Sequence, residues 1–246
     1  MVIDSIEGDE ASTARRKTID LPTGPLPLEE IEAQIIAGLK RPGHNRTEEI
    51  RRLRRSFTKD LAGSSPRFVL GLAERLIDRD DMTLRFVAYE LVQHHEAASK
   101  SLNTTTLEGL GRGIASWGAV DCFACYLSGP AWRERQVPDS LIHRWARSKD
   151  RWWRRAALVS TVPLNSKARG GSGEAARTLQ ICEMLVDDRD DMVVKAMSWA
   201  LRELAKRDRP AVQAFIRARR TNLAPRVIRE VQNKLRAGLK NPRKQS

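Results

Sequence analysis

LAERLIDRDDMTLRFVAYELVQHH (residues 72–95) and CEMLVDDRDDMVVKAMSWALRELA (residues 182–205) are two copies of one pattern, and this pattern decides the fold. The pentapeptide Asp-Arg-Asp-Asp-Met occupies residues 78–82 in the first copy and residues 188–192 in the second. On either side of it, apolar residues recur three and four positions apart, which is the spacing of an amphipathic helix. Each copy therefore predicts a helix, a short acidic turn and a second helix, and repetition of such pairs indicates a solenoid.

A looser third copy reads SKDRWWRRAAL (residues 148–158). In this alignment Arg155 takes the position that Arg85 and Lys195 hold in the other two copies. Stacked helix pairs form all-α, HEAT-like superhelices with a concave face, and basic residues at one repeated position would line that face. The alternative is that these residues form ordinary charge pairs one helical turn apart on the outer surface.

Helical spacing continues through most of the remaining chain. A first helix begins at Leu28 with two acidic residues in its first turn, a position that the helix dipole favours. One long glycine-rich loop is predicted at 165–173. Further helices are predicted over 46–62, 66–78, 82–96, 102–114, 116–128, 138–148, 151–162, 174–187, 191–207, 209–219 and 224–239.

The chain divides into one predicted domain and two tails. Residues 1–27 lack helical periodicity and end in a proline cluster, so we expect a flexible N-terminal tail. We expect residues 28–240 to form a single HEAT-like repeat domain and residues 241–246 to form a basic C-terminal tail. We expect the protein to be a monomer.

The chain is strongly basic, with 44 Lys and Arg against 31 Asp and Glu and a formal net charge of +13. Basic residues are concentrated in residues 40–59, 133–155 and 202–246, which folding brings into one patch or leaves as three separately solvated faces. Such a balance favours a polyanionic partner, either nucleic acid or an anionic membrane surface. No apolar run approaches the ~20 residues that a membrane helix needs, so we expect no membrane insertion.

Three cysteines are too few for a disulfide framework and favour a reducing compartment, so we expect a cytoplasmic, nucleoid-associated protein. Cys122 and Cys125 form a CxxC motif, but no second CxxC and no nearby pair of histidines accompanies it. We interpret both as small buried residues and predict neither a metal nor a cofactor.

One segment, IASWGAVDCFACYL (residues 114–127), contains a single charge, Asp121. A helix that is apolar all round is a buried helix, so this carboxylate must be paired, hydrogen-bonded or directed into a cleft. Trp117 lies four residues earlier and therefore shares a helix face with Asp121. Two interpretations remain open: a functional carboxylate beside an indole, or a structural one that caps a neighbouring helix or pairs with an arginine.

Two further clusters combine indole and guanidinium groups. Residues 152–155 read Trp-Trp-Arg-Arg, so Arg154 and Arg155 are candidate DNA-binding residues, as is Lys195 from the repeat. Trp199 and Arg202 lie one turn apart on another predicted helix. Aromatic residues interleaved with arginine are typical of nucleic-acid contacts, although tryptophan is equally a core residue.

Three motifs carry a family resemblance: SWGAVD (residues 116–121), WWRRAAL (residues 152–158) and KAMSWALRE (residues 195–203). In this order they resemble the bacterial DNA alkylation repair glycosylases of the AlkD type, over roughly residues 38–238. The resemblance implies a superhelix of HEAT-like repeats that clasps duplex DNA carrying alkylated bases. The chain departs from the family pattern at Ser116 and Gly118, where the family often has an aromatic and a polar residue.

The resemblance also implies roles for individual residues. Asp121 would be the catalytic carboxylate, Trp117 and Trp199 would flank the sugar of the lesion, and Arg155 and Arg202 would hold the DNA backbone. An N3- or N7-alkylated purine already carries a positive charge and leaves as a neutral base, so a single carboxylate that stabilises the sugar cation is sufficient.

Three hypotheses for function follow. The first is a DNA glycosylase that hydrolyses the N-glycosidic bond of cationic alkylpurines in duplex DNA. The second is a non-catalytic HEAT-repeat protein that binds damaged or branched DNA. The third, a protein-interaction scaffold, gains no support from a net charge of +13.

Overall fold

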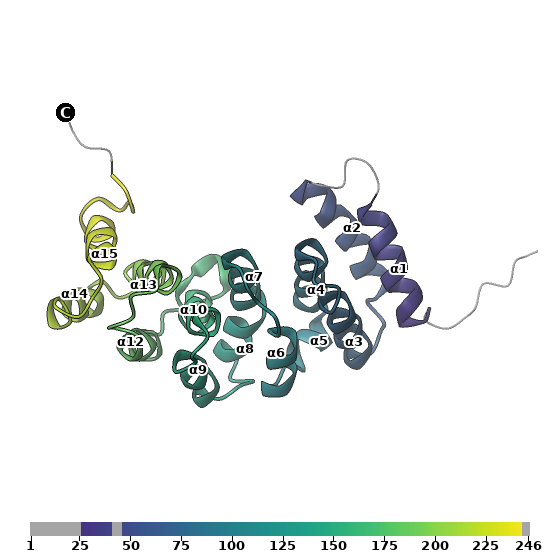
Figure 1. The fold of residues 1–246 in the computed structure, drawn as a ribbon, viewed down its shortest axis with the longest axis horizontal. Helices are drawn as coiled ribbons and strands as arrows, with labels where there is room; N and C mark the ends of the chain where they lie inside the picture. The colour runs from purple at the N-terminus through teal and green to yellow at the C-terminus, as the bar shows by residue number, and fades with distance from the viewer. Residues whose placement is uncertain (1–25, 41–45, 243–246) are drawn as a thin grey trace, which may run out of the picture.

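The computed structural model describes residues 26–40 and 46–242, and within these ranges every regular element is a helix. The helices stack side by side into an arch with two layers, and the N-terminal and C-terminal helices lie at its opposite ends (Figure 1). The predicted all-α solenoid is thereby confirmed. The predicted tails, residues 1–27 and 241–246, lie almost entirely outside the described residues.

One layer follows the concave, upper side of the arch in Figure 1, and each of its helices contacts the next. It consists of α2 (Thr47–Asp60), α4 (Met82–His94), α7 (Trp117–Phe123), α10 (Arg151–Ser160), α13 (Asp191–Leu204) and α15 (Pro225–Ala237). The other layer consists of α3 (Pro66–Ile77), α6 (Thr104–Leu110), α9 (Asp139–Ala146), α12 (Ala175–Met184) and α14 (Arg209–Ala218), and α1 (Leu28–Leu39) covers the N-terminal end.

Several short elements were not predicted from the sequence. They are α5 (Glu96–Lys100), α8 (Gly129–Arg133), α11 (Val162–Asn165) and the 3₁₀ turn η2 (Lys167–Arg169), which lies inside the predicted loop. The helix predicted over 116–128 is α-helical only to Phe123 and continues as the π-helical turn η1 (Ala124–Ser128). Pro130 and Pro163 occupy the first turns of α8 and α11, where a missing N–H breaks no helical hydrogen bond. A new helix begins one residue before each of these prolines, although the apolar pattern by itself continues across both positions.

Aspartate caps start three helices of the concave layer. The Asp150 and Asp190 carboxylates accept backbone N–H bonds at the starts of α10 and α13, and Asp81 does so at the start of α4. Asp81 and Asp190 are not equivalent positions of the repeated pentapeptide, because Asp81 aligns with Asp191 and Asp80 aligns with Asp190. Asp80 itself takes a left-handed conformation with φ of 51°. The second copy therefore begins its helix one residue earlier than the first, because a different aspartate of the same motif serves as cap.

An aromatic cluster locks the two layers together in the middle of the arch. The ring of Phe123 lies 5.8 Å from Trp145 and 6.0 Å from Trp153, and the two indoles are 4.8 Å apart. Tyr89 of α4 adds a fourth ring, 5.8 Å from Phe123. Trp145 and Trp153 are thus packing residues of the core, and the ring of Phe123 joins α7 to α9 of the other layer and to its neighbour α10.

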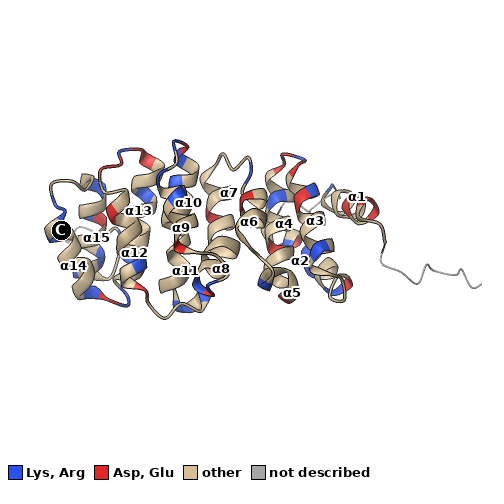
Figure 2. Cartoon of the chain, turned by 90° about the horizontal axis from the view of Figure 1, so that it is seen from below, with Lys and Arg blue, Asp and Glu red and all other residues tan. Residues whose placement is uncertain are grey.

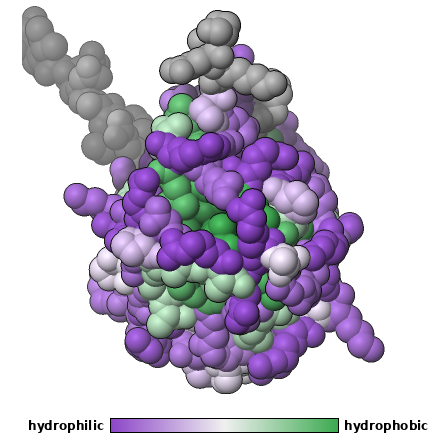
Figure 3. All heavy atoms as spheres, turned by 90° about the vertical axis from the view of Figure 1, so that its left-hand side faces the viewer, coloured by the Kyte–Doolittle hydropathy of each residue, from purple (hydrophilic) through white to green (hydrophobic). Residues whose placement is uncertain are grey.

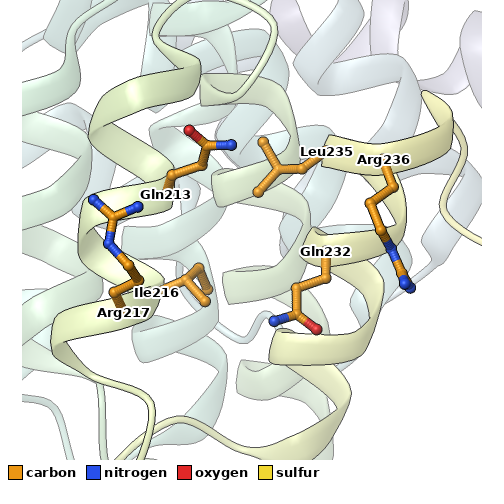
Figure 4. Close-up of a pocket in the computed structure, with 6 residues that line it drawn as sticks. All are labelled: Gln213, Ile216, Arg217, Gln232, Leu235 and Arg236. Carbon is orange, nitrogen blue, oxygen red and sulfur yellow. The ribbon is translucent and has the colours of Figure 1, made fainter.

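Acidic and basic residues are interspersed along the two long edges of the molecule (Figure 2). At the C-terminal end, apolar side chains are visible in a hollow between polar ones (Figure 3). A cavity of about 320 Å³ opens there between α14 and α15, lined by Gln213, Ile216, Arg217, Gln232, Leu235 and Arg236 (Figure 4). Within the described ranges, no helix combines the length and the apolar character that crossing a membrane demands.

Candidate active site on the concave side

Asp121 lies in the middle of α7, at the centre of the concave layer. The helix begins at Trp117 because the hydroxyl of Ser116 accepts the backbone N–H of Ala119 at 3.2 Å. Asp121 follows one turn later, and its side chain retains 20% of its exposure. The carboxylate is therefore neither fully solvated nor sealed in the core.

Arg155 of α10 binds both oxygens of this carboxylate. Its Nε donates to one oxygen of Asp121 at 3.0 Å and its Nη2 donates to the other at 2.9 Å. Its Nη1 donates to the carbonyl of Met192, the second residue of α13, at 2.5 Å. Because the Arg155 side chain is only 6% exposed, the guanidinium joins α7, α10 and α13 into one rigid unit.

The environment of Asp121 acts on its pKa in two directions. Burial raises the pKa above the ordinary value of 3.8, because the charged form loses water. The hydrogen bonds and the positive charge of Arg155 oppose this rise. A partly buried carboxylate interacts more strongly with a nearby positive charge than a solvated one does.

The two tryptophans proposed from the sequence occupy different environments. Trp117 is 63% exposed at the start of α7, although its indole is one of the largest apolar groups in the chain. Trp199 of α13 is half-buried and packs against the core. An indole left this exposed beside a half-buried carboxylate is a feature that packing does not require.

Arg202 lies one turn beyond Trp199 on α13. Its Nε donates to the hydroxyl of Ser198 at 3.2 Å, and this hydroxyl donates to the buried carboxylate of Glu230 on α15 at 2.6 Å. Burial lowers the pKa of the Arg202 guanidinium, and the charge of Glu230 opposes the shift. Arg202 is thus held in place from behind by the next helix of the concave layer.

The other two basic residues proposed for DNA binding are engaged within the protein. Lys195 pairs with Asp191, four residues earlier, at 2.6 Å, as the charge-pair interpretation of the repeat describes. Arg154 donates to Asp188 at 2.7 Å and to the carbonyls of Ser148 and Lys149. Arg155 is the member of the Trp-Trp-Arg-Arg cluster that reaches Asp121.

Another group on this side of the layer was missed in the sequence. The rings of Phe86 and Tyr126 are 6.3 Å apart, and Arg51 of α2 lies 5.5 Å from the centre of the Phe86 ring. Arg169 of η2 lies 5.6 Å from the centre of the Tyr126 ring. Tyr126 falls in the π-helical turn, where spacing differs from that of an α-helix, so helical periodicity could not indicate its direction.

The CxxC motif lies beside this group but within the packing. Cys125 is buried and Cys122 is half-buried. Burial raises the pKa of the Cys122 thiol to about 11 and that of Cys125 to about 12, so both thiols are protonated at neutral pH. They behave as the small apolar residues that the sequence predicted.

The fold and this site define a class: helical-repeat proteins that carry a paired carboxylate and an exposed indole on the concave layer. The chain belongs to the DNA alkylation repair enzyme family, whose sequence model it matches over residues 45–235. No curated protein matches it. The match confirms the family resemblance, and α7, α10 and α13 all lie within the matched range.

Proposed function

We propose that the protein is a DNA glycosylase that hydrolyses the N-glycosidic bond of N3- and N7-alkylated purines in duplex DNA, with Asp121 as its catalytic carboxylate. The observation that carries the proposal is the position of Asp121: half-buried, aligned by two hydrogen bonds from Arg155, and one turn from the exposed Trp117. Membership of a DNA alkylation repair enzyme family supports the substrate class.

The chemistry suits one carboxylate. As the C1′–N bond of a cationic purine breaks, its electron pair passes to the base, which leaves neutral, and positive charge develops on the deoxyribose. Asp121 stabilises this charge and orients the water whose oxygen forms the new bond to C1′, and the proton that this water loses passes to solvent. The face of Trp117 adds cation–π attraction to the same charge, and the proposed reaction requires no metal or cofactor.

Arg155 serves this reaction mainly by acting on Asp121. Three of the five N–H donors of its guanidinium are used within the protein, on Asp121 and on the Met192 carbonyl. The side chain is nearly buried, so orientation of the carboxylate is a larger part of its role than contact with phosphate. Arg202 and Trp199 are proposed to contact the DNA strand on the neighbouring helix.

The test compares Asp121→Asn with a matched control, Asp188→Asn. Asp188 pairs at 2.7 Å with Arg154, which precedes Arg155 on α10, and its side chain is 11% exposed, but it lies before α13 rather than on α7. Release of free 7-methylguanine from duplex DNA is the measurement. In Asp121→Asn it should fall by about 10²–10³-fold, whereas duplex binding should persist and Asp188→Asn should excise at the parental rate once folded.

Two results would contradict the proposal. Parental excision by a folded Asp121→Asn variant would remove the catalytic assignment. Absence of released base from the parent protein, together with tight binding to damaged or branched duplexes, would favour the second hypothesis, a non-catalytic DNA-binding protein of the same fold.

A further inference from the structure

Three large apolar side chains are exposed among the described residues, and two of them, Met82 and Trp117, are the first residues of neighbouring helices of the concave layer. Met82, the first residue of α4, is 50% exposed, and Trp117, the first residue of α7, is 63% exposed. The hydroxyl of Ser116 lies 3.6 Å from the sulfur of Met82, which places the two helix starts side by side. Adjoining exposed apolar groups indicate a surface that a partner covers.

Gly118 keeps the space beside this pair open. A methyl group at Gly118 would meet only the terminal carbon of Met82, at 3.8 Å, within a radius of 4 Å. The φ angle of Gly118 is not of the kind that requires glycine, since the residue lies in the regular helix α7. Glycine costs helix stability at such a position, so the space it leaves calls for a reason other than backbone conformation.

We propose that Met82 of α4 extends the sugar contact that the family resemblance assigns to Trp117: its thioether packs against the deoxyribose and the base edge of the nucleotide at the lesion, and Gly118 keeps this platform of Met82 and Trp117 accessible. The inference rests on the proposed function and extends its site from α7 to α4. The carbon edge of the sugar is the apolar part of the DNA strand, and a flexible, polarisable thioether adapts to such a surface.

The position of the platform relative to charged groups supports this occupant. Asp121 lies one helical turn from Trp117, so a sugar on the platform would present C1′ toward the carboxylate. Two arginines at nearby helix starts keep much of their exposure although each has an acidic neighbour: Arg112 precedes α7, is 65% exposed and pairs with Asp78 at 2.9 Å, and Arg151 begins α10, is 52% exposed and lies 3.6 Å from Asp190. An apolar centre flanked by guanidinium groups suits a nucleotide flanked by its two phosphates.

The first test replaces the thioether. Met82→Ala should weaken binding to a duplex with one tetrahydrofuran abasic analogue, and slow single-turnover excision of 7-methylguanine, each by about three- to tenfold. Met82→Leu should keep most of both because it restores apolar contact. Leu239→Ala, which truncates the third exposed apolar side chain at the C-terminal end, should change neither. Equal losses in Met82→Ala and Leu239→Ala, or none in Met82→Ala, would overturn the inference.

The second test fills the space above the platform. Gly118→Leu should preserve or raise the melting temperature, because leucine favours a helix more than glycine does. The same change should weaken duplex binding and excision, because its side chain would occupy the position of the sugar. A Gly118→Leu protein with parental binding would overturn the inference.

A third measurement does not depend on excision. Peroxide oxidation of Met82, followed by peptide mass spectrometry, should slow when the duplex is bound, whereas oxidation of the half-buried Met184 on α12 should not change. Protection of Met82 without base release would support the platform while contradicting the glycosylase proposal. Base release without protection of Met82 would support the glycosylase proposal and contradict the platform.

Discussion

At the scale of single residues, Asp121 has features of both roles that the sequence left open, a functional carboxylate and a structural one. The structure shows the pairing with an arginine that a structural role predicts. The same pair leaves the carboxylate partly exposed and one turn from an exposed indole, as a catalytic role requires. The two roles are compatible, because in the proposed reaction a carboxylate that is already oriented needs no reorganisation when the sugar becomes cationic.

The pKa of Asp121 leads to a prediction about pH. In the proposed mechanism excision requires the carboxylate form, so the rate should fall as the pH is lowered through the pKa of Asp121, which burial raises and Arg155 lowers. Arg155→Gln removes the opposing charge, so the pKa should rise further and the acid limb of the pH–rate profile should move to higher pH. Arg154→Gln, on the same helix, should leave that limb in place. An unshifted limb in Arg155→Gln would show that the guanidinium does not control the ionisation.

At the scale of elements, helix starts were the most predictable feature and helix interiors the least. The starts of α3, α4, α10 and α13 follow prolines or capping carboxylates and hydroxyls that the sequence displays directly. The π-helical turn after Phe123 has no such signal, since no side-chain cap precedes it. The Phe86–Tyr126 group was missed for this reason, and the partner of Asp121 could not be chosen among the arginines without the stacking of α7 on α10.

The cap of α7 provides a prediction at this scale. Ser116→Ala removes the hydroxyl that caps α7 and should destabilise the protein by about 1 kcal/mol, measured as a shift in denaturant midpoint. Excision should also fall, because the cap fixes the first turn that carries Trp117. Ser65→Ala, which removes the equivalent cap of α3 at 3.2 Å, should cost similar stability and leave excision unchanged. Equal excision by Ser116→Ala and Ser65→Ala would show that the cap of α7 does not affect the site.

At the scale of the whole molecule, the repeat predicted the arch, but charge along the chain did not predict where charge lies on it. Two of the basic residues chosen from the sequence, Arg154 and Lys195, are used in pairs with Asp188 and Asp191. The sequence displays basic residues without showing which acidic neighbour the fold supplies. Arg202, by contrast, is held by a hydroxyl that a buried glutamate orients, so its positive charge remains available to a partner.

The salt dependence of DNA binding tests this distinction. Duplex affinity should fall steeply with salt, because phosphates neutralised by basic residues release their counterions. Arg202→Gln should lower the slope of log affinity against log salt by about one and weaken binding alike on all sequences. The control is Arg144→Gln, since Arg144 is exposed on the outer layer and pairs with Glu108 at 2.7 Å. That variant should keep the parental slope, because its charge faces away from the concave layer. Equal slopes for Arg202→Gln and the parent would mean that α13 does not contact the DNA backbone, and equal losses in both variants would indicate diffuse attraction over the whole surface.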